Sequence, residues 1–305
     1  MSTDAISPLR QRMLDDMTAR HLGPHTQQDY IRSCKRFAAF LKRSPETATA
    51  DDIRRFQLDL AESGISIGNR NGIVTGVKFL FRVTLRRHEL GAEFYSVRDP
   101  RKIALVMSPD EIERLLAAAK TLRLQAMLSL SYGCGLRIGE VVRLKAGDID
   151  SAQNIIRIVQ SKGRKDRNVM LPPEVLAILR QWWVKRPTKY DAGVPKEKRL
   201  LFPSRQSAHL STRQLSRLFQ KTVKAAGMRK PVTSHSLRHS FATHLLENGT
   251  DIRIIQAILG HEKLDTTAHY TRVATGIIST VQSPIGLLPG KGGKPKKRRR
   301  QTEPA

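Results

Sequence analysis

Apolar residues recur at every third or fourth position along most of the chain, a spacing that predicts a mainly helical protein. In the first hundred residues the pattern marks three helices. The first follows a capping pair, Thr26 and Asp29, the second spans about residues 49–64, and the third spans about residues 71–88. Because each of these helices has one apolar face, we expect them to pack together as a small helical bundle.

The regular pattern breaks in the segment VRDPRKIALVMSP, which contains two prolines and has no helical period. This change predicts a linker over residues 99–107, which separates a helical domain of residues 1–98 from a second domain. The second domain begins with a helix start signal, in which Ser108 is the cap, Pro109 stands in the first turn and Glu111 follows three residues after the cap.

The second domain combines further helices with one short hairpin. Residues 154–160 are rich in isoleucine and valine, the polar turn SKGRKD follows, and RNVML returns as a second strand that ends at Pro172. The fold class is therefore mainly α with a small β-hairpin or sheet, and residues 108–283 form a mixed α/β domain. Residues 284–305 are rich in glycine, proline and basic residues, so we expect a disordered basic tail.

The charge of the chain points to a polyanionic partner. The sequence carries 54 lysines and arginines against 27 acidic residues, a formal net charge of +27. Nucleic acid is the favoured partner, and an anionic membrane surface is the weaker alternative. No membrane span is expected, because the most apolar stretch contains Lys120 and Arg123.

The cysteines indicate a reducing compartment. Cys34 and Cys134 are the two cysteines of the chain, and their separation fits neither a disulfide framework nor a metal-binding spacing. The opening residues MSTDAISPLR lack the apolar core of a secretory signal. A cytoplasmic location is the simplest expectation.

Candidate chemistry gathers in the second domain. The segment HSLRHSFATHLLENG places His235 and Arg238 one turn apart on a predicted helix that ends at Gly249. Such a compact basic surface suits an anionic group. Other polar residues stand at the ends of predicted elements of the same domain, and the full candidate set is Arg137, Lys162, His235, Arg238, His261 and Tyr270.

The segments that carry these residues resemble the tyrosine site-specific recombinases, also called the phage integrase family. They are LSYGCGLRIGEVVRL, SKGRKD, HSLRHSFATHLLENGTDIRIIQAILGH and DTTAHYTRV, and their spacing is most similar to the Xer-like branch and its relatives on mobile elements. The first domain is similar to the family's SAM-like core-binding domain. The resemblance assigns one role to each candidate: first arginine (Arg137), hairpin lysine (Lys162), H-x-x-R histidine and arginine (His235 and Arg238), histidine-or-tryptophan position (His261) and nucleophile (Tyr270).

The resemblance also implies a partner and a reaction. The partner is double-stranded DNA at specific recombination sites, bound by four copies of the chain on synapsed DNA, with a related recombinase or accessory proteins as further candidates. Strands are cut and rejoined through a 3′-phosphotyrosyl intermediate. This intermediate retains the energy of the phosphodiester bond, so neither a metal nor a nucleotide cofactor is expected.

Elementary chemistry supports these roles. Two arginines hold the nonbridging oxygens of a phosphodiester through paired hydrogen bonds and stabilise the charge that grows in the transition state. His235 is a candidate base for the tyrosine proton. Lysine gives up a proton more readily than arginine, which favours Lys162 as the acid for the leaving 5′-oxygen, although Arg164 and Lys165 share its turn.

Several alternatives stay open at this point. A type IB topoisomerase shares the chemistry, and a DNA-binding regulator with an inactive site shares the basic surface. His235 and His239 have the spacing of a zinc pair but lack the glutamate of that motif and an evident third ligand. Glu140, one turn from Arg137, either orients this arginine or forms a local ion pair.

The C-terminal region raises two further alternatives. The segment GIISTVQSPIGLL either caps its own domain or, as the resemblance implies, docks on a neighbouring subunit. The KPKKRRR run either is a nuclear localisation patch or follows the DNA backbone.

Overall fold

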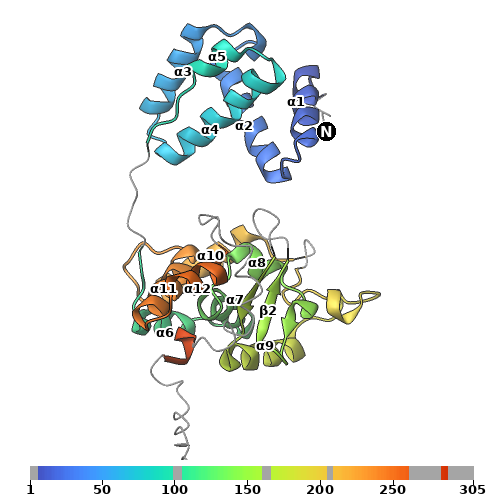
Figure 1. The fold of residues 1–305 in the computed structure, drawn as a ribbon, viewed down its shortest axis with the longest axis vertical. Helices are drawn as coiled ribbons and strands as arrows, with labels where there is room; N and C mark the ends of the chain where they lie inside the picture. Colours follow the sequence, from blue (N-terminus) through green and yellow to red (C-terminus); the bar gives the residue numbers. More distant parts are fainter. Residues whose placement is uncertain (1–5, 99–104, 160–165, 205–208, 261–282, 288–305) are drawn as a thin grey trace, which may run out of the picture. The chain divides into compact units, whose positions relative to one another are not determined.

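The computed structural model describes residues 6–98, 105–159, 166–204, 209–260 and 283–287. The chain divides into two compact units, Met1–Lys102 and Ile103–Ala305. Both are mainly helical, and a small sheet lies in the second unit (Figure 1). No helix in the described part of the chain combines the length and the apolar character that crossing a membrane requires.

The first unit is a bundle of helices around a cluster of phenylalanines. The ring of Phe37 lies 4.9 Å from that of Phe56 and 5.9 Å from that of Phe81, so helices far apart in the sequence share one core. The elements are α1 (Pro8–Ala19), α2 (Pro24–Leu41), the 3₁₀ turn η1 (Pro45–Thr47), α3 (Ala50–Glu62), α4 (Ile67–Phe79), the π-helix η2 (Leu80–Thr84) and α5 (His88–Glu93).

Two of the helices predicted in this unit have wrong limits. Helix α2 begins at Pro24, because a proline fits the first helical position, and Gly23 takes the place of the cap expected at Thr26. The helix expected over residues 71–88 is interrupted: α4 ends at Phe79, and the π-helix follows. Arg86 then adopts a left-handed φ of 56°, which the regular apolar spacing of this segment does not reveal.

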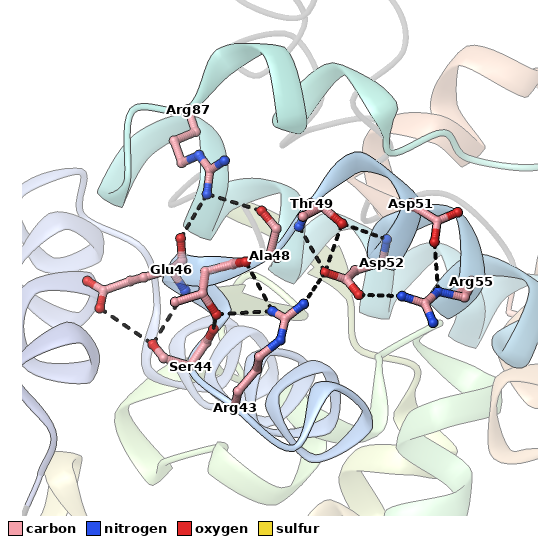
Figure 2. A network of polar contacts seen from close by, with 10 residues as sticks. Arg43, Ser44, Glu46, Ala48, Thr49, Asp51, Asp52, Arg55 and Arg87 are labelled. Atoms are coloured by element: carbon pink, nitrogen blue, oxygen red, sulfur yellow. Dashed lines mark hydrogen bonds and ion pairs between the residues drawn. The ribbon is translucent and has the colours of Figure 1, made fainter.

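A network of polar contacts holds the connection between α2 and α3 (Figure 2). Asp52 accepts a hydrogen bond from the backbone amide of Thr49, which closes a capping box at the start of α3. Arg43 pairs with Asp52 at 2.5 Å. From the other side Arg87 donates to the backbone carbonyl of Glu46 at 2.8 Å. The loop therefore has a fixed conformation although most of its residues face solvent.

The second unit packs helices around α7 (Leu122–Gly133), most of whose residues are buried. The three-stranded antiparallel sheet has the order β1 (Ile149–Asp150), β2 (Ile155–Ile158) and β3 (Arg167–Met170). The helices are α6 (Pro109–Ala117), α8 (Ile138–Arg143), α9 (Pro173–Lys185), α10 (Thr212–Ala225), α11 (Ser234–Glu247) and α12 (Ile252–Leu259), and the 3₁₀ turns are η3 (Ala146–Asp148), η4 (Lys196–Lys198) and η5 (Pro284–Leu287).

The mainly helical fold with a small sheet confirms the predicted class. The β2–β3 pairing places Ile156 opposite Val169, as the apolar alternation of the two strands requires. Strand β1 has only two residues, which is too short to leave a periodic signal in the sequence. It pairs with β2 and extends the predicted hairpin to three strands.

The C-terminal prediction needs a correction. Residues 284–287 were expected to begin a disordered tail, but they form η5, and Ile285 is fully buried in the core of the second unit. The Ser283 hydroxyl donates to the carbonyl of Gly133 at 2.8 Å and fixes the start of this turn. The burial of Ile285 and the hydrogen bond from Ser283 therefore hold a segment whose composition alone suggests disorder. Residues 277–281 and 288–305 lie outside the described residues.

Candidate active site

Arg137 stands at the start of α8, directly after a tight turn. Gly135 in that turn has a left-handed φ of 63°, and a side chain there would bring its Cβ to 2.6 Å from the ring of Phe241. Glycine is therefore required both by the backbone and by the close packing of α11. The turn fixes the direction in which Arg137 leaves the core, and its side chain keeps 24% of its surface exposed.

Arg238 is buried on α11 and reaches the same turn. Its Nη1 donates to the backbone carbonyl of Gly135 at 2.6 Å, and its Nη2 donates to that of Leu259 at the end of α12. The carboxyl end of a helix carries partial negative charge, so it favours a guanidinium there. These two carbonyls hold Arg238 beside the turn that directly precedes Arg137.

His235 lies one turn before Arg238 and is open to solvent on one side. Partial burial lowers its pKa below the ordinary histidine value, and the positive charges of His239, Arg238 and Arg137 lower it further. The neutral imidazole is therefore favoured at neutral pH, which is the form that accepts a proton.

Glu140 is the buried centre of this cluster. Its carboxylate accepts the backbone amide of Arg137 at 2.8 Å and the Nη1 of the same residue at 3.0 Å. It also receives two hydrogen bonds from Arg167, at 2.8 and 2.7 Å. Burial alone would raise the pKa of Glu140, but the hydrogen bonds and charge of Arg167, together with the bonds from Arg137, lower it to about 2. Glu140 thus contacts Arg137 within a wider network, not only as a local ion pair.

Arg167 is the functional candidate that the sequence reading missed. It begins β3 and is only 8% exposed, and its Nε donates to the carbonyl of Ile258 at 2.8 Å. The sequence offers only a partial signal: Arg167 and Val169 alternate in the predicted strand and so share one face, and it is the structure that buries this face. A guanidinium on such a face needs a buried acid, and Glu140 is that acid.

The structure brings three of the six predicted residues together, and these are Arg137, His235 and Arg238. The charge of Arg137 lowers the pKa of both His235 and Arg238, and the charge of Arg238 lowers the pKa of His235. The other three, Lys162, His261 and Tyr270, lie outside the described residues. Within the described ranges no three histidine, cysteine, aspartate or glutamate side chains lie close enough together to hold a metal ion.

The charges of the site favour an anionic ligand. Burial lowers the pKa of Arg238, and the positive charges of Arg137 and Arg167 lower it further, while Glu140 opposes the change. Glu140 carries one negative charge and Arg137, Arg167 and Arg238 each carry one positive charge, so these four side chains together are positive. A phosphodiester beside Arg137 and Arg238 would reduce this repulsion and accept hydrogen bonds in a fixed geometry.

A helical fold with this arginine pair and a small sheet is that of the tyrosine site-specific recombinases, which act on DNA. Residues 106–276 match the phage integrase family, and residues 9–89 match the phage integrase N-terminal SAM-like domain. The chain belongs to the phage integrase family. Its activity is site-specific DNA recombination, and neither the topoisomerase nor the inactive regulator is favoured.

Relatives across most of the chain carry recombinase names. A putative integrase/recombinase, y4qK, of Sinorhizobium fredii is 40% identical over 287 residues, which is 93% of this chain and 90% of that protein. The tyrosine recombinase XerD of Caulobacter vibrioides is 35% identical over 270 residues, which is 84% of this chain and 88% of that protein.

A solved structure confirms the fold at lower identity. A lambda integrase dimer bound to a COC′ core site superimposes with a TM-score of 0.65 at 21% identity, covering 85% of this chain and 95% of that one.

Proposed function

We propose that this recombinase cleaves DNA with Tyr270 as its nucleophile. The phenolic oxygen attacks the scissile phosphorus, the bond from phosphorus to the 5′-oxygen breaks, and a 3′-phosphotyrosyl bond forms. The 5′-hydroxyl of a second strand then reverses the step and completes strand exchange. The observation that carries the proposal is the fixed position of Arg238 beside the turn that presents Arg137.

Each remaining residue has one role in this proposal. Arg137 and Arg238 bind the nonbridging oxygens and stabilise the added negative charge of the transition state. His235, whose pKa is lowered, accepts the proton of Tyr270. Lys162 protonates the leaving 5′-oxygen, and His261 supplies a further donor to the phosphate. Every bond that is broken is replaced by one of similar energy, so the cycle needs neither metal nor ATP.

The assembly proposed around this site is four copies of the chain on two specific DNA sites. The domain of residues 1–98 and the catalytic domain of residues 108–283 both bind the duplex, and residues 99–107 connect them. The net charge of +27 supports extensive contact with phosphates. A cytoplasmic, nucleoid-associated location, a related recombinase, accessory proteins and an origin on a mobile element belong to the same proposal.

A nicked suicide substrate tests the nucleophile. Loss of a short 5′-fragment after cleavage prevents rejoining, so a covalent complex accumulates on a denaturing gel. We expect the wild-type chain to form this complex and Tyr270→Phe to form none while it still binds the same DNA. Tyr190→Phe is the matched control, because it removes a phenolic oxygen elsewhere in the second unit. It should leave the yield of covalent complex unaltered. A covalent complex that persists in Tyr270→Phe would disprove the assignment.

A further inference from the structure

Arg167 is a buried charge of the second unit that the catalytic scheme above does not use. Its side chain is 6% exposed, and it joins elements that are far apart in the sequence. Two of its nitrogens donate to the two carboxylate oxygens of Glu140, at 2.8 and 2.7 Å, and its Nε donates to Ile258 at 2.8 Å. Glu140 also contacts Arg137, and Ile258 directly precedes Leu259, whose carbonyl accepts a hydrogen bond from Arg238.

The first connection runs through Glu140 to Arg137. A carboxylate bonded to Arg137 competes with a phosphate for the charge and the donors of that arginine. The bidentate pair with Arg167 neutralises this carboxylate from its other side. The Glu140 group therefore positions Arg137 without cancelling the positive charge that a phosphodiester requires.

The second connection runs through the end of α12 to Arg238. Arg167 binds the carbonyl of Ile258, and Arg238 binds the carbonyl of the next residue, Leu259. The helix ends at Gly260, which has a left-handed φ of 62°, and a Cβ there would lie 2.9 Å from Cδ of Arg167. The absence of a side chain at Gly260 thus leaves room for the aliphatic part of Arg167. Because Arg167 binds the end of α12, a shift of its side chain would also displace the Leu259 carbonyl that holds Arg238.

We propose that Arg167 is a positioning residue for the recombination reaction. It holds Arg137 through Glu140 and Arg238 through the end of α12, and it offsets the charge of Glu140. The inference rests on the proposed function, because it takes a DNA phosphodiester as the anion that the two arginines bind. Arg167 itself contacts neither DNA nor the reacting atoms in this scheme. Its effect is on the charge and orientation of the pair that does.

The test compares single-turnover cleavage by Arg167→Gln and Arg167→Lys at saturating suicide substrate. We expect a loss of about 100-fold for Arg167→Gln, with the DNA affinity little changed, because the transition-state contacts of the arginine pair are weakened. Arg167→Lys keeps the charge but loses the planar fork, so it should recover part of the rate. Arg157→Gln, which changes an exposed arginine of the neighbouring strand β2, is the matched control and should cleave at the wild-type rate.

Two further measurements separate positioning from a structural role. On a substrate with a neutral methylphosphonate at the scissile position the loss caused by Arg167→Gln should shrink to about 10-fold or less, since the arginine pair has less charge to stabilise. The double variant Glu140→Gln with Arg167→Gln should cleave faster than Arg167→Gln alone, because it removes the carboxylate that Arg167 no longer neutralises.

The proposal is overturned by wild-type cleavage in Arg167→Gln, or by equal losses on both substrates without recovery in the double variant. Should Arg167→Gln fail to fold, the ratio of losses on the two substrates is read from Arg167→Lys. These rates report strand cleavage whichever residue is the nucleophile. Failure of the Tyr270 assignment is therefore seen in the Tyr270→Phe experiment, and failure of the Arg167 assignment is seen here.

Discussion

Asp52 in the first unit and Glu140 in the second occupy the same local position. Each is the third residue of its helix, each closes a capping box on the backbone amide three residues earlier, and each is buried between two arginines. Figure 2 shows the first case, with Arg43 and Arg55 on either side of Asp52. The same sequence device, an acid in the first helical turn, therefore serves both units.

The arginines around the two acids differ. Those that bind Asp52 are 42% and 62% exposed and come from positions nine residues before it and three residues after it. Arg167, which binds Glu140, is 6% exposed and comes from a strand 27 residues later. The first network stabilises one helix start at the surface, whereas the second joins separate elements through a buried ion pair. Partial loss of a buried network is costly, which makes the second network a more sensitive determinant of structure.

The largest expected effect comes from removing each acid. Glu140→Ala removes the carboxylate that accepts two hydrogen bonds from the buried Arg167, so the second unit should lose about 3–5 kcal/mol of unfolding free energy. Asp52→Ala removes a cap whose arginines return to water, so the first unit should lose about 1–2 kcal/mol. Both tryptophans of the chain, Trp182 and Trp183, lie in α9, so their fluorescence during urea unfolding reports the second unit.

The same experiment contains its control. Asp52→Ala should leave the tryptophan transition unchanged and alter only the far-ultraviolet circular dichroism, which follows helices in both units. Equal losses in the two variants would mean that the burial of Arg167 does not distinguish the networks.

The pH dependence of stability provides a second comparison of Asp52 with Glu140, for which the expected effect is smaller. The backbone amide of Thr49 and then the charges of Arg43 and Arg55 lower the pKa of Asp52 below 3.8, and the pKa of Glu140 falls from 4.5 to about 2. A lowered pKa means that the folded state binds fewer protons than the unfolded state. The stability is therefore complete above the ordinary pKa and is lost as the pH falls through the lowered one.

This linkage predicts how each isosteric variant differs from the wild type. The differences in unfolding free energy for Asp52→Asn and for Glu140→Gln should be constant above about pH 5.5 and narrow below it. The difference for Glu140→Gln should still be present at about pH 3, since its pKa is about 2. Urea titrations at a series of pH values measure both, and a difference that widens on acidification would contradict the assignment of these carboxylates.

The two networks were not equally visible in the sequence. A helix start at Thr49 was predictable because its partners lie within a few residues. The sequence shows Glu140 one turn from Arg137 but leaves its role open, because the deciding partner, Arg167, comes from another element. Apolar periodicity placed Arg167 in a returning strand without showing that its face is buried. Local signals therefore predict capping, whereas a long-range ion pair requires the tertiary fold.

The same limit explains the other differences. Strand β1 is too short for a periodic signal, and Ile285 stands among glycine and proline residues that suggest a tail, yet it is buried against α7. The arginine pair and His235 were predictable because the spacing of their motifs resembles a known family. The resemblance alone supports the roles of Lys162, His261 and Tyr270, since these residues lie outside the described residues.

The smallest expected effect separates a surface pair from the rest of the Asp52 network. Arg55 contacts Asp51 at 3.0 Å and Asp52 at 2.8 Å, but its side chain is 62% exposed and that of Asp51 is 70% exposed. Arg55→Ala should therefore destabilise the first unit by only about 0.3–0.5 kcal/mol, and 1 M salt should abolish the difference because the screening length falls to about 3 Å. Urea unfolding followed by circular dichroism at low and high salt measures it. A loss of stability as large as that of Asp52→Ala, and unchanged by salt, would show that Arg55 is as strongly coupled to Asp52 as Arg167 is to Glu140. The contrast between the two networks would then rest on sequence distance alone.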